Sequence, residues 1–182
     1  MVTRGVVNEY LDLLARQQNL STTFESLNIG LPDSTVVQGP NRVIAPETMR
    51  AVVTATRQGR QLRASYASLS RPEAVESILE PHTLVCAGDS WHLRAWCDSN
   101  REFRDFALSR FRTSPEALRQ RARHTRDQDE HWNRQVTLVV TPDQRLTQAQ
   151  QEIIARDYGM EHGRLEVATR AALAPYVLSR LG

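Results

Sequence analysis

The sequence contains no lysine, so all 23 of its cationic side chains are arginines. An arginine guanidinium is a planar fork that grips a carboxylate or a phosphate through two hydrogen bonds, which the compact ammonium of lysine does not do. Genome base composition is the simplest cause of this bias, but the physical consequence is the same. The formal net charge is only +2 and is too small to indicate nucleic-acid binding by itself.

Cysteine is scarce. Cys86 and Cys97 form neither a CxxC pair nor a disulfide framework, and we expect them to fill core positions. No apolar run approaches the ~18 residues that span a bilayer, and no secretory signal pattern opens the chain. These absences predict a cytoplasmic protein with no membrane partner. The 182 residues, 40% of them hydrophobic, are enough for one large or two small globular domains.

Several enzyme motifs are absent as well. The chain has no GxGxxG or GxxxxGK[ST] phosphate loop, no HExxH metal site and no GxSxG nucleophile elbow. One cluster, HTRDQDEH at residues 124–131, holds possible metal ligands, but on a helix its two histidines would lie about 10 Å apart. We interpret this cluster as a solvated linker. We expect no catalytic residue, no metal site and no cofactor, and therefore no enzyme.

Hydrophobic spacing predicts the elements of the first two thirds of the chain. Residues 4–18 have the spacing of an amphipathic helix, and residues 19–45 are typical of a connector. A helix is predicted from Pro46 to Gly59. Five short strands follow, at residues 61–67, 74–81, 82–87, 90–97 and 101–111, with Pro81 between the second and the third. Short strands with tight turns predict a small barrel or a strongly bent sheet.

The last third of the chain has a different pattern of predicted elements. Residues 115–131 are helix-like at first and then highly charged, which predicts a domain boundary. The order after it is strand, helix, strand and helix, at residues 135–141, 147–159, 164–170 and 174–181. This βαβα order predicts a small α/β unit.

The predicted hairpin at residues 90–111, SWHLRAWCDSNREFRDFALSRF, is unusually rich in arginine. From Arg94 to Arg126 the chain has nine arginines against four acids. Arginines interleaved with aromatic rings suit stacking on a base and gripping a phosphate. The alternative is a solvated face on which the arginines pair with Glu102 and Asp105. The pattern by itself leaves both interpretations open and slightly favours the solvated face.

The same stretch resembles a WYL domain, a family named for a Trp-Tyr-Leu triplet on a central strand. The resemblance rests on Tyr66, Glu80-Pro81-His82, Trp91-His92-Leu93, Arg101, Phe103, Arg104 and Arg110-Phe111. His92 stands where the family usually has tyrosine, so the ligand preference could differ. Residues 41–66 are similar to the helix that leads into the domain. Residues 136–181 resemble the C-terminal extension of a subset of these regulators, which includes repressors of bacterial phage-defence operons.

The resemblance implies a fold and a function. The expected fold class is α+β, with N-terminal helices, a small Sm-like (SH3-like) β-barrel and the C-terminal α/β unit. The expected domains are residues 1–45 (helix and connector), 46–114 (WYL domain), 115–134 (linker) and 135–182 (candidate dimerisation unit). The family's ligand residues correspond to Tyr66, His82, Trp91, His92, Arg101, Arg104 and Arg110.

The implied function is the sensing and dimerising portion of a transcriptional regulator. A nucleotide or nucleic-acid-like anion would bind the WYL domain and control DNA binding by a winged-helix domain that we expect to be missing from this chain. The expected partners are that ligand, a second copy of the chain, and DNA only through the missing domain. A standalone single-stranded nucleic-acid-binding protein is the alternative, and an enzyme is a distant third.

Overall fold

A computed structural model of the chain describes residues 42–88 and 90–181. Residues 42–182 form one compact unit of the chain. The predicted N-terminal helix at residues 4–18 and most of the connector lie outside the described residues. No helix in the described part of the chain is long and apolar enough to cross a membrane.

Helix α2 (Pro46–Gln58) forms where the sequence predicts it. Proline stands at its start and Glu47 in its first turn, where a negative charge favours the helix dipole. Gly59 ends it with a left-handed φ of 59°, and the Gly59 N–H caps the carbonyls of the last turn. The helix buries Val52 and Ala55 against the sheet that follows.

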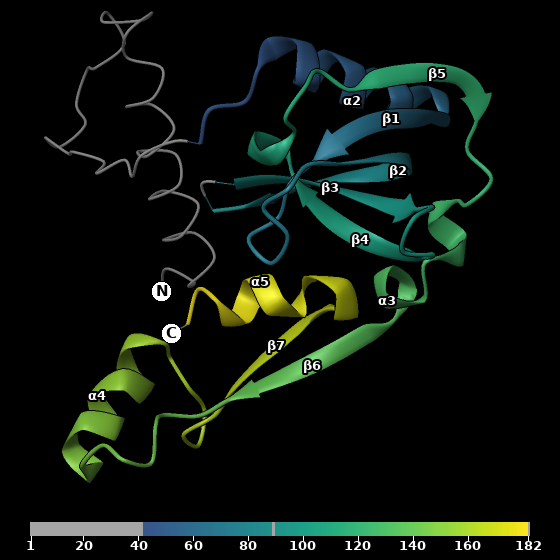
Figure 1. The fold of residues 1–182 in the computed structure, drawn as a ribbon. Coiled ribbons are helices and arrows are strands. Elements are labelled where there is room, and N and C mark those ends of the chain that lie inside the picture. The colour runs from purple at the N-terminus through teal and green to yellow at the C-terminus, as the bar shows by residue number, and fades with distance from the viewer. Residues whose placement is uncertain (1–41, 89, 182) are drawn as a thin grey trace, which may run out of the picture. The chain divides into compact units, whose positions relative to one another are not determined.

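The next five strands form one antiparallel sheet in the order β4-β3-β2-β1-β5 (Figure 1). Their bounds are β1 (Arg60–Tyr66), β2 (Val75–Ala87), β3 (Ser90–Cys97), β4 (Glu102–Ala107) and β5 (Glu116–Arg121). The sheet is open, because β4 and β5 are its two edges and no ladder joins them among the described residues. The predicted closed Sm-like barrel is therefore not confirmed.

The sheet bends strongly although it does not close. After the 3₁₀ turn η2 (Leu108–Arg110), the chain returns to the end of β1, where Phe111 makes an isolated bridge with Tyr66. The Arg112 N–H also donates to the Ser65 carbonyl at 2.9 Å. Residues 111–112 and strand β5 thus both pair with β1 and not with β4. Strand β4 therefore remains an edge of the sheet.

Three sequence predictions in this region are wrong. Cys86 on β2, expected to fill a core position, is exposed, whereas Cys97 is buried as expected. The strands predicted on either side of Pro81 are one strand, β2, because a bulge between Pro81 and Thr83 absorbs the proline without breaking the ladder to β3. Residues 116–121, predicted to be helix-like, form the edge strand β5 paired with β1. Pairing with an exposed neighbouring strand overrides the helical propensity of EALRQR.

The core lies between α2 and the concave face of the sheet. Leu62, Leu79 and Leu93 are fully buried there, together with Phe106 and Val52. Each fully buried leucine contributes roughly 1.5–3 kcal/mol of transfer free energy. On β3, Leu93, Ala95 and Cys97 are buried on one side of the strand, but Trp91 on the same side is 43% exposed, so the expected apolar face is confirmed only in part.

The C-terminal residues follow the predicted order of elements. They are α3 (Glu130–Asn133), β6 (Gln135–Val140), α4 (Gln148–Asp157), β7 (Leu165–Arg170), η4 (Ala171–Leu173) and α5 (Ala174–Leu178). Thr147 caps α4 in a reciprocal capping box with Gln150, as expected from the sequence. However, β6 and β7 are antiparallel. Because α4 buries no residue, it does not pack as the crossover helix that a parallel α/β pair requires, and the unit is α+β.

Candidate ligand pocket and the buried network behind it

The concave side of the bent sheet opens into a pocket of about 450 Å³. Its apolar part is formed by Ala64 and Tyr66 on β1, Leu79 on β2 and Phe106 on β4. Three arginines line it: Arg71 in the β1–β2 loop, Arg104 on β4 and Arg110 in η2. The pocket thus combines aromatic surface with converging guanidinium groups.

Small polar side chains complete the pocket wall. Ser68 and Ser70 come from the β1–β2 loop, Ser77 from β2, and Ser99 with Asn100 from the β3–β4 turn. Hydroxyl and amide groups are neutral donors and acceptors, and Asp105 is the one acidic residue of the lining, so the three arginines leave the pocket with a net positive charge. The wall suits an anionic ligand that also carries polar groups.

Tyr66 is held in a fixed position at the pocket. Its hydroxyl oxygen accepts a hydrogen bond from the Ala107 N–H at 3.1 Å. Its ring meets Phe106 and Phe111 edge-on, with centroids 5.0 Å and 5.5 Å away. This geometry presents a rigid aromatic surface beside the arginines.

Arg104 is held only loosely. Its Nε lies 3.4 Å from Glu102 Oε1, in a pair whose side chains are both about half exposed. Such exposed pairs contribute little, roughly 0.2–1 kcal/mol, and a bound anion can displace them. The pairing of hairpin arginines with Glu102 and Asp105, expected of a solvated face, therefore exists, but for Arg104 it is weak.

The seven predicted ligand residues separate into two groups. Tyr66, Arg104 and Arg110 come together in the pocket. The other four lie elsewhere: Arg101 is an exposed residue of the β3–β4 turn with φ of 54°, and His82, Trp91 and His92 do not line the pocket. Sequence reasoning missed Arg71 and the serines, although the stretch SLSRP between two strands carried the signal of a polar loop.

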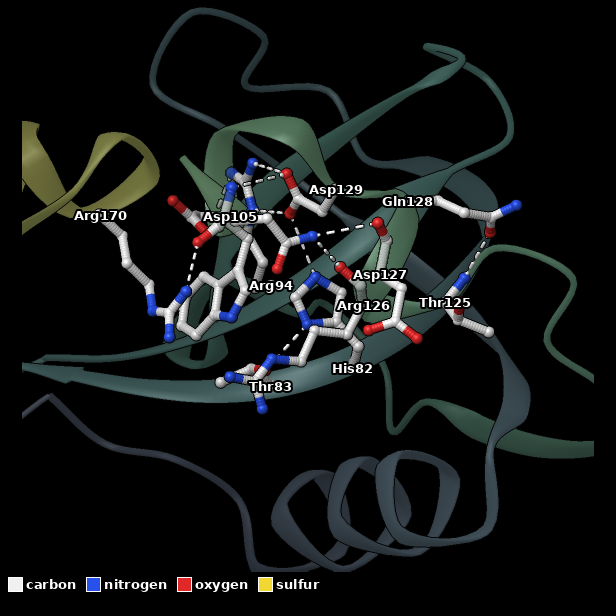
Figure 2. Close-up of polar contacts among 12 residues, drawn as sticks. His82, Thr83, Arg94, Asp105, Thr125, Arg126, Asp127, Gln128, Asp129 and Arg170 are labelled. Atoms are coloured by element: carbon white, nitrogen blue, oxygen red, sulfur yellow. Dashed lines mark hydrogen bonds and ion pairs between the residues drawn. The ribbon is translucent and has the colours of Figure 1, made fainter. Parts of the chain in front are cut away.

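Arg94, on the opposite face of the hairpin, is not solvated but bound in a network of carboxylates (Figure 2). Arg94 is only 6% exposed and binds Asp129, which is 1% exposed. The Arg94 Nε donates to Asp129 Oδ2 at 2.7 Å and the Arg94 Nη2 donates to Oδ1 at 3.1 Å. Asp105 lies 3.5 Å from the same guanidinium. Arg94 is thus a structural residue between two carboxylates.

Asp129 was expected to lie in a solvated linker, and that interpretation is wrong for this residue. Its carboxylate also accepts from the Trp132 N–H at 3.1 Å, so it caps helix α3. Burial alone would raise the pKa of Asp129, but the hydrogen bonds from Arg94 and Trp132 outweigh it and hold the pKa below its usual value.

His82 belongs to the same network. Its Nε2 lies 3.2 Å from Asp129 Oδ2, and its Nδ1 lies 2.8 Å from Thr83 Oγ1. Burial lowers the pKa of His82, and the attraction of Asp129 offsets this only in part, so the ring is neutral at pH 7. Because a carboxylate only accepts, Nε2 carries the proton and Nδ1 accepts from the Thr83 hydroxyl. Both ring nitrogens are therefore engaged within the protein.

His92 joins the sheet to the C-terminal elements. Its ring packs on Tyr176 of α5 with centroids 4.9 Å apart, and burial is the main cause that lowers its pKa. Burial, and then the charge of Asp105, raises the pKa of Tyr176. Trp91, on the other side of β3, is 43% exposed.

A second buried carboxylate fastens the chain that follows β5. Glu80, 1% exposed, accepts from Gln61 Nε2 at 2.7 Å and from the N–H groups of Arg123 and His124 at 2.9 Å and 2.7 Å. The His124 ring stacks on Trp96 with centroids 3.9 Å apart. Burial raises the pKa of Glu80, but these hydrogen bonds outweigh it and leave it lowered.

Known proteins share this architecture. Residues 47–114 match the WYL domain family, and residues 135–182 match the family described as BrxR transcriptional regulator, C-terminal dimerization domain. The chain is 34% identical over 179 residues to the DNA-binding transcriptional repressor CapW of Stenotrophomonas maltophilia, covering 98% of this chain and 60% of that protein. It is 37% identical over 140 residues to CapW of Pseudomonas aeruginosa, covering 77% of this chain and 46% of that protein.

The chain thus spans about half the length of these curated relatives, 60% of one and 46% of the other. A solved structure, Proteasome accessory factor B/C (PafBC) of Arthrobacter aurescens, aligns with 77% of this chain and 24% of that chain, at 26% identity and a TM-score of 0.40. The two family matches and the CapW relatives agree on one assignment. The chain contains a WYL domain at residues 47–114 and a BrxR-type C-terminal dimerization domain at residues 135–182.

Proposed function

We propose that this chain is the ligand-sensing and dimerising part of a CapW-like transcriptional repressor, and that its pocket binds a nucleotide or a short nucleic-acid anion. The observation that carries the proposal is the convergence of Arg71, Arg104 and Arg110 on one pocket beside Tyr66 and Phe106. Three forked cations beside aromatic surface suit a phosphate joined to a base. The volume of about 450 Å³ lies within the range usual for small-molecule sites.

Strand β4 offers a route from the pocket to the C-terminal elements. Arg104 and Asp105 are consecutive, so their side chains lie on opposite faces of the sheet. Both residues line the pocket, and Asp105 also contacts Arg94 and, through it, Asp129. An anion that draws on Arg104 would shift β4 and with it the contacts of Asp105.

The C-terminal elements touch this network at two points. His92 packs on Tyr176 of α5, and Arg170 of β7 donates from Nη1 to the Trp132 carbonyl at 2.6 Å. A change at Asp105 or Asp129 would therefore reach β7 and α5. We propose that this shift alters the geometry of a homodimer and so the DNA affinity of the whole repressor.

We assign dimerisation to residues 135–182. The other three proposed parts of the chain are residues 1–45, 46–114 and 115–134. In support, residues 135–182 expose large apolar side chains at Val139, Ile153, Tyr158 and Leu178. DNA recognition is assigned to a winged-helix domain of the whole repressor. Multi-angle light scattering should give the mass of a dimer for the chain, and the mass of a monomer would contradict this assignment.

The ligand proposal is tested by titrating the chain with ATP and with a labelled four-nucleotide DNA oligomer. Replacing Arg104 and Arg110 together by alanine should lower the affinity at least tenfold, because each charge-assisted hydrogen bond contributes about 1.5–3 kcal/mol. The matched control is Arg112→Ala, an exposed neighbour that does not line the pocket.

Three outcomes would contradict the proposal. Binding of neither probe would exclude the nucleotide class. Unchanged binding by the double variant would show that the site lies elsewhere. Tight binding of a thirty-nucleotide single strand, with steep salt dependence and no affinity for the short probes, would instead support the standalone nucleic-acid binder.

A further inference from the structure

A second group of arginines lies away from the pocket, where α2, β1 and β5 run side by side (Figure 1). We call it the β5 arginine surface, and it consists of Arg57, Arg60, Arg119, Arg121 and Arg123. Residues 57–63 and 117–126 contribute these side chains, and neither segment contains an acidic residue. The surface is therefore a local concentration of positive charge.

Strand pairing forces these charges together. Arg60 on β1 and Arg121 on β5 are directly opposite each other in the antiparallel ladder. Like charges at such positions repel and destabilise a sheet unless an anion lies between them. In addition, the Ala122 N–H donates to the Gly59 carbonyl at 2.9 Å, which holds the end of β5 beside the C-terminus of α2.

Like several other exposed arginines among the described residues, these arginines have no protein partner for their side chains, so what sets them apart is their grouping. Arg63, three residues along β1 from Arg60, is paired with Glu116 at 2.9 Å, and Arg94 is buried between carboxylates. Within residues 42–88 and 90–181, no hydrogen bond or ion pair is formed by the side chains of the β5 arginine surface. Four of the five side chains are exposed, and Arg60 is half-buried.

We infer that the β5 arginine surface docks the phosphate backbone of double-stranded DNA. The strand is an edge, so alternate side chains of β5 can reach a long anion without obstruction by a further strand. Large exposed apolar side chains are absent from α2, β1 and β5 among the described residues. Single-stranded nucleic acid is bound through aromatic stacking, whereas a duplex is held through its phosphates.

The choice of DNA over other polyanions rests on the proposed function, since a transcriptional repressor acts on a DNA duplex. The surface shares no residue with the pocket, whose arginines are Arg71, Arg104 and Arg110. Backbone contacts of this kind carry no sequence information; they add affinity and orient the protein.

The test is fluorescence anisotropy of a labelled thirty-base-pair duplex of random sequence, titrated with the chain between 20 and 200 mM salt. The variant replaces Arg119, Arg121 and Arg123 by glutamine. Each lost phosphate contact should reduce the slope of log K against log salt by about 0.9, so roughly 2.7 in all. Affinity at 50 mM salt should fall at least tenfold.

A matched control replaces Arg145, Arg156 and Arg164, three exposed arginines of the C-terminal elements, by glutamine. It removes the same charge and should keep the slope. If the β5 triple variant does not fold, the pair Arg57→Gln and Arg121→Gln takes its place, with an expected slope change of about 1.8. The variant that replaces Arg104 and Arg110 in the pocket should still bind the duplex. A failure of the proposed ligand pocket would therefore leave duplex binding unchanged, and the two proposals can be tested independently.

No binding of the duplex at 50 mM salt would overturn the inference. Equal losses in the β5 variant and in the control would overturn it too, because they would show general attraction and no defined surface. Tighter binding of a single strand than of the duplex would exclude a duplex-specific role.

Discussion

Arg94 and Arg104 belong to adjacent strands of one hairpin, yet their surroundings are opposite. Arg94 is buried, bidentate on Asp129 and 3.5 Å from Asp105. Arg104 is half exposed, weakly paired with Glu102 and part of the pocket wall. In the sequence, both are arginines among aromatic residues. The difference arises because successive strand positions face opposite sides of the sheet, one side covered by residues 124–132 and the other open to the pocket.

This comparison teaches that one residue type serves two purposes in the hairpin. A buried arginine must be fully matched by carboxylates, since an unpaired buried charge costs several kcal/mol. An arginine with a weak partner remains available for a ligand. Substitutions at the two arginines and their neighbours, together with acidification, test this difference.

Asp129→Ala should have the largest effect on stability. It leaves the guanidinium of Arg94 buried beside Asp105 alone and removes the cap of α3, so we expect a loss of about 3–5 kcal/mol in the free energy of unfolding. Urea denaturation followed by circular dichroism measures this loss. Asp143→Ala, which breaks the exposed pair with Arg145, is the control and should leave the midpoint nearly unchanged. Equal effects would refute the distinction between buried and exposed pairs.

Acidification should destabilise the protein in two steps. The pKa of His82 is lowered from 6.5 in the fold, so below pH 6.5 the unfolded chain takes up a proton that the folded chain does not, and stability falls. The lowered pKa values of Asp129 and Glu80 add a further loss as the pH falls through and below their ordinary values of 3.8 and 4.5.

Melting temperatures between pH 8 and pH 3 measure both steps. His82→Gln should weaken the first step, because the glutamine side chain does not titrate. The variant should be less stable than the unaltered chain at every pH. His131→Gln, a change at an exposed histidine, is the control and should keep both steps. A curve for His82→Gln parallel to that of the unaltered chain would contradict the role of His82.

Tyr66→Phe should have a smaller effect. The ring contacts with Phe106 and Phe111 remain, but the Ala107 N–H loses its acceptor, so we expect a cost of about 0.5–1.5 kcal/mol. Chemical denaturation measures it. Ligand affinity should change little if the ring stacks on the ligand, and a large loss of affinity would show that the hydroxyl itself contacts it.

Arg104→Ala should have the smallest effect on stability, below about 0.5 kcal/mol, while it weakens ligand binding. The exposed pair with Glu102 contributes little, and no buried charge is left behind. Thermal unfolding with and without ATP separates the two effects: the unliganded midpoint should stay, and the shift caused by ATP should shrink. A lower unliganded midpoint would show that Arg104 is structural, like Arg94.

The local signals in the sequence predicted much of the secondary structure. Proline at the start and Gly59 at the end defined α2, and the helix predicted at residues 147–159 corresponds to α4. The alternation in SWHLRAWC placed Leu93, Ala95 and Cys97 on the buried face of β3. These features depend on neighbouring residues, which is why the sequence is sufficient for them.

The site could be predicted only in part. Tyr66, Arg104 and Arg110 were predicted and do meet in the pocket, whereas Arg71 was missed because a loop between strands gives no signal of where its side chains converge. His82 and His92 were expected near a ligand, but both are packed against segments far along the chain, at Asp129 and Tyr176. Contacts between residues so distant in sequence leave no local pattern.

What the sequence alone determined is therefore the composition of the hairpin, an arginine-rich pair of strands with one apolar face, and the order of the elements around it. Only the tertiary structure decided that the sheet stays open, that residues 116–121 form its edge, and that Arg94 is buried while Arg104 faces a pocket. The physical reason is that an arginine side chain is stable either in water or between carboxylates. Which of these two environments it has depends on whether a segment distant in the sequence covers that face of the sheet.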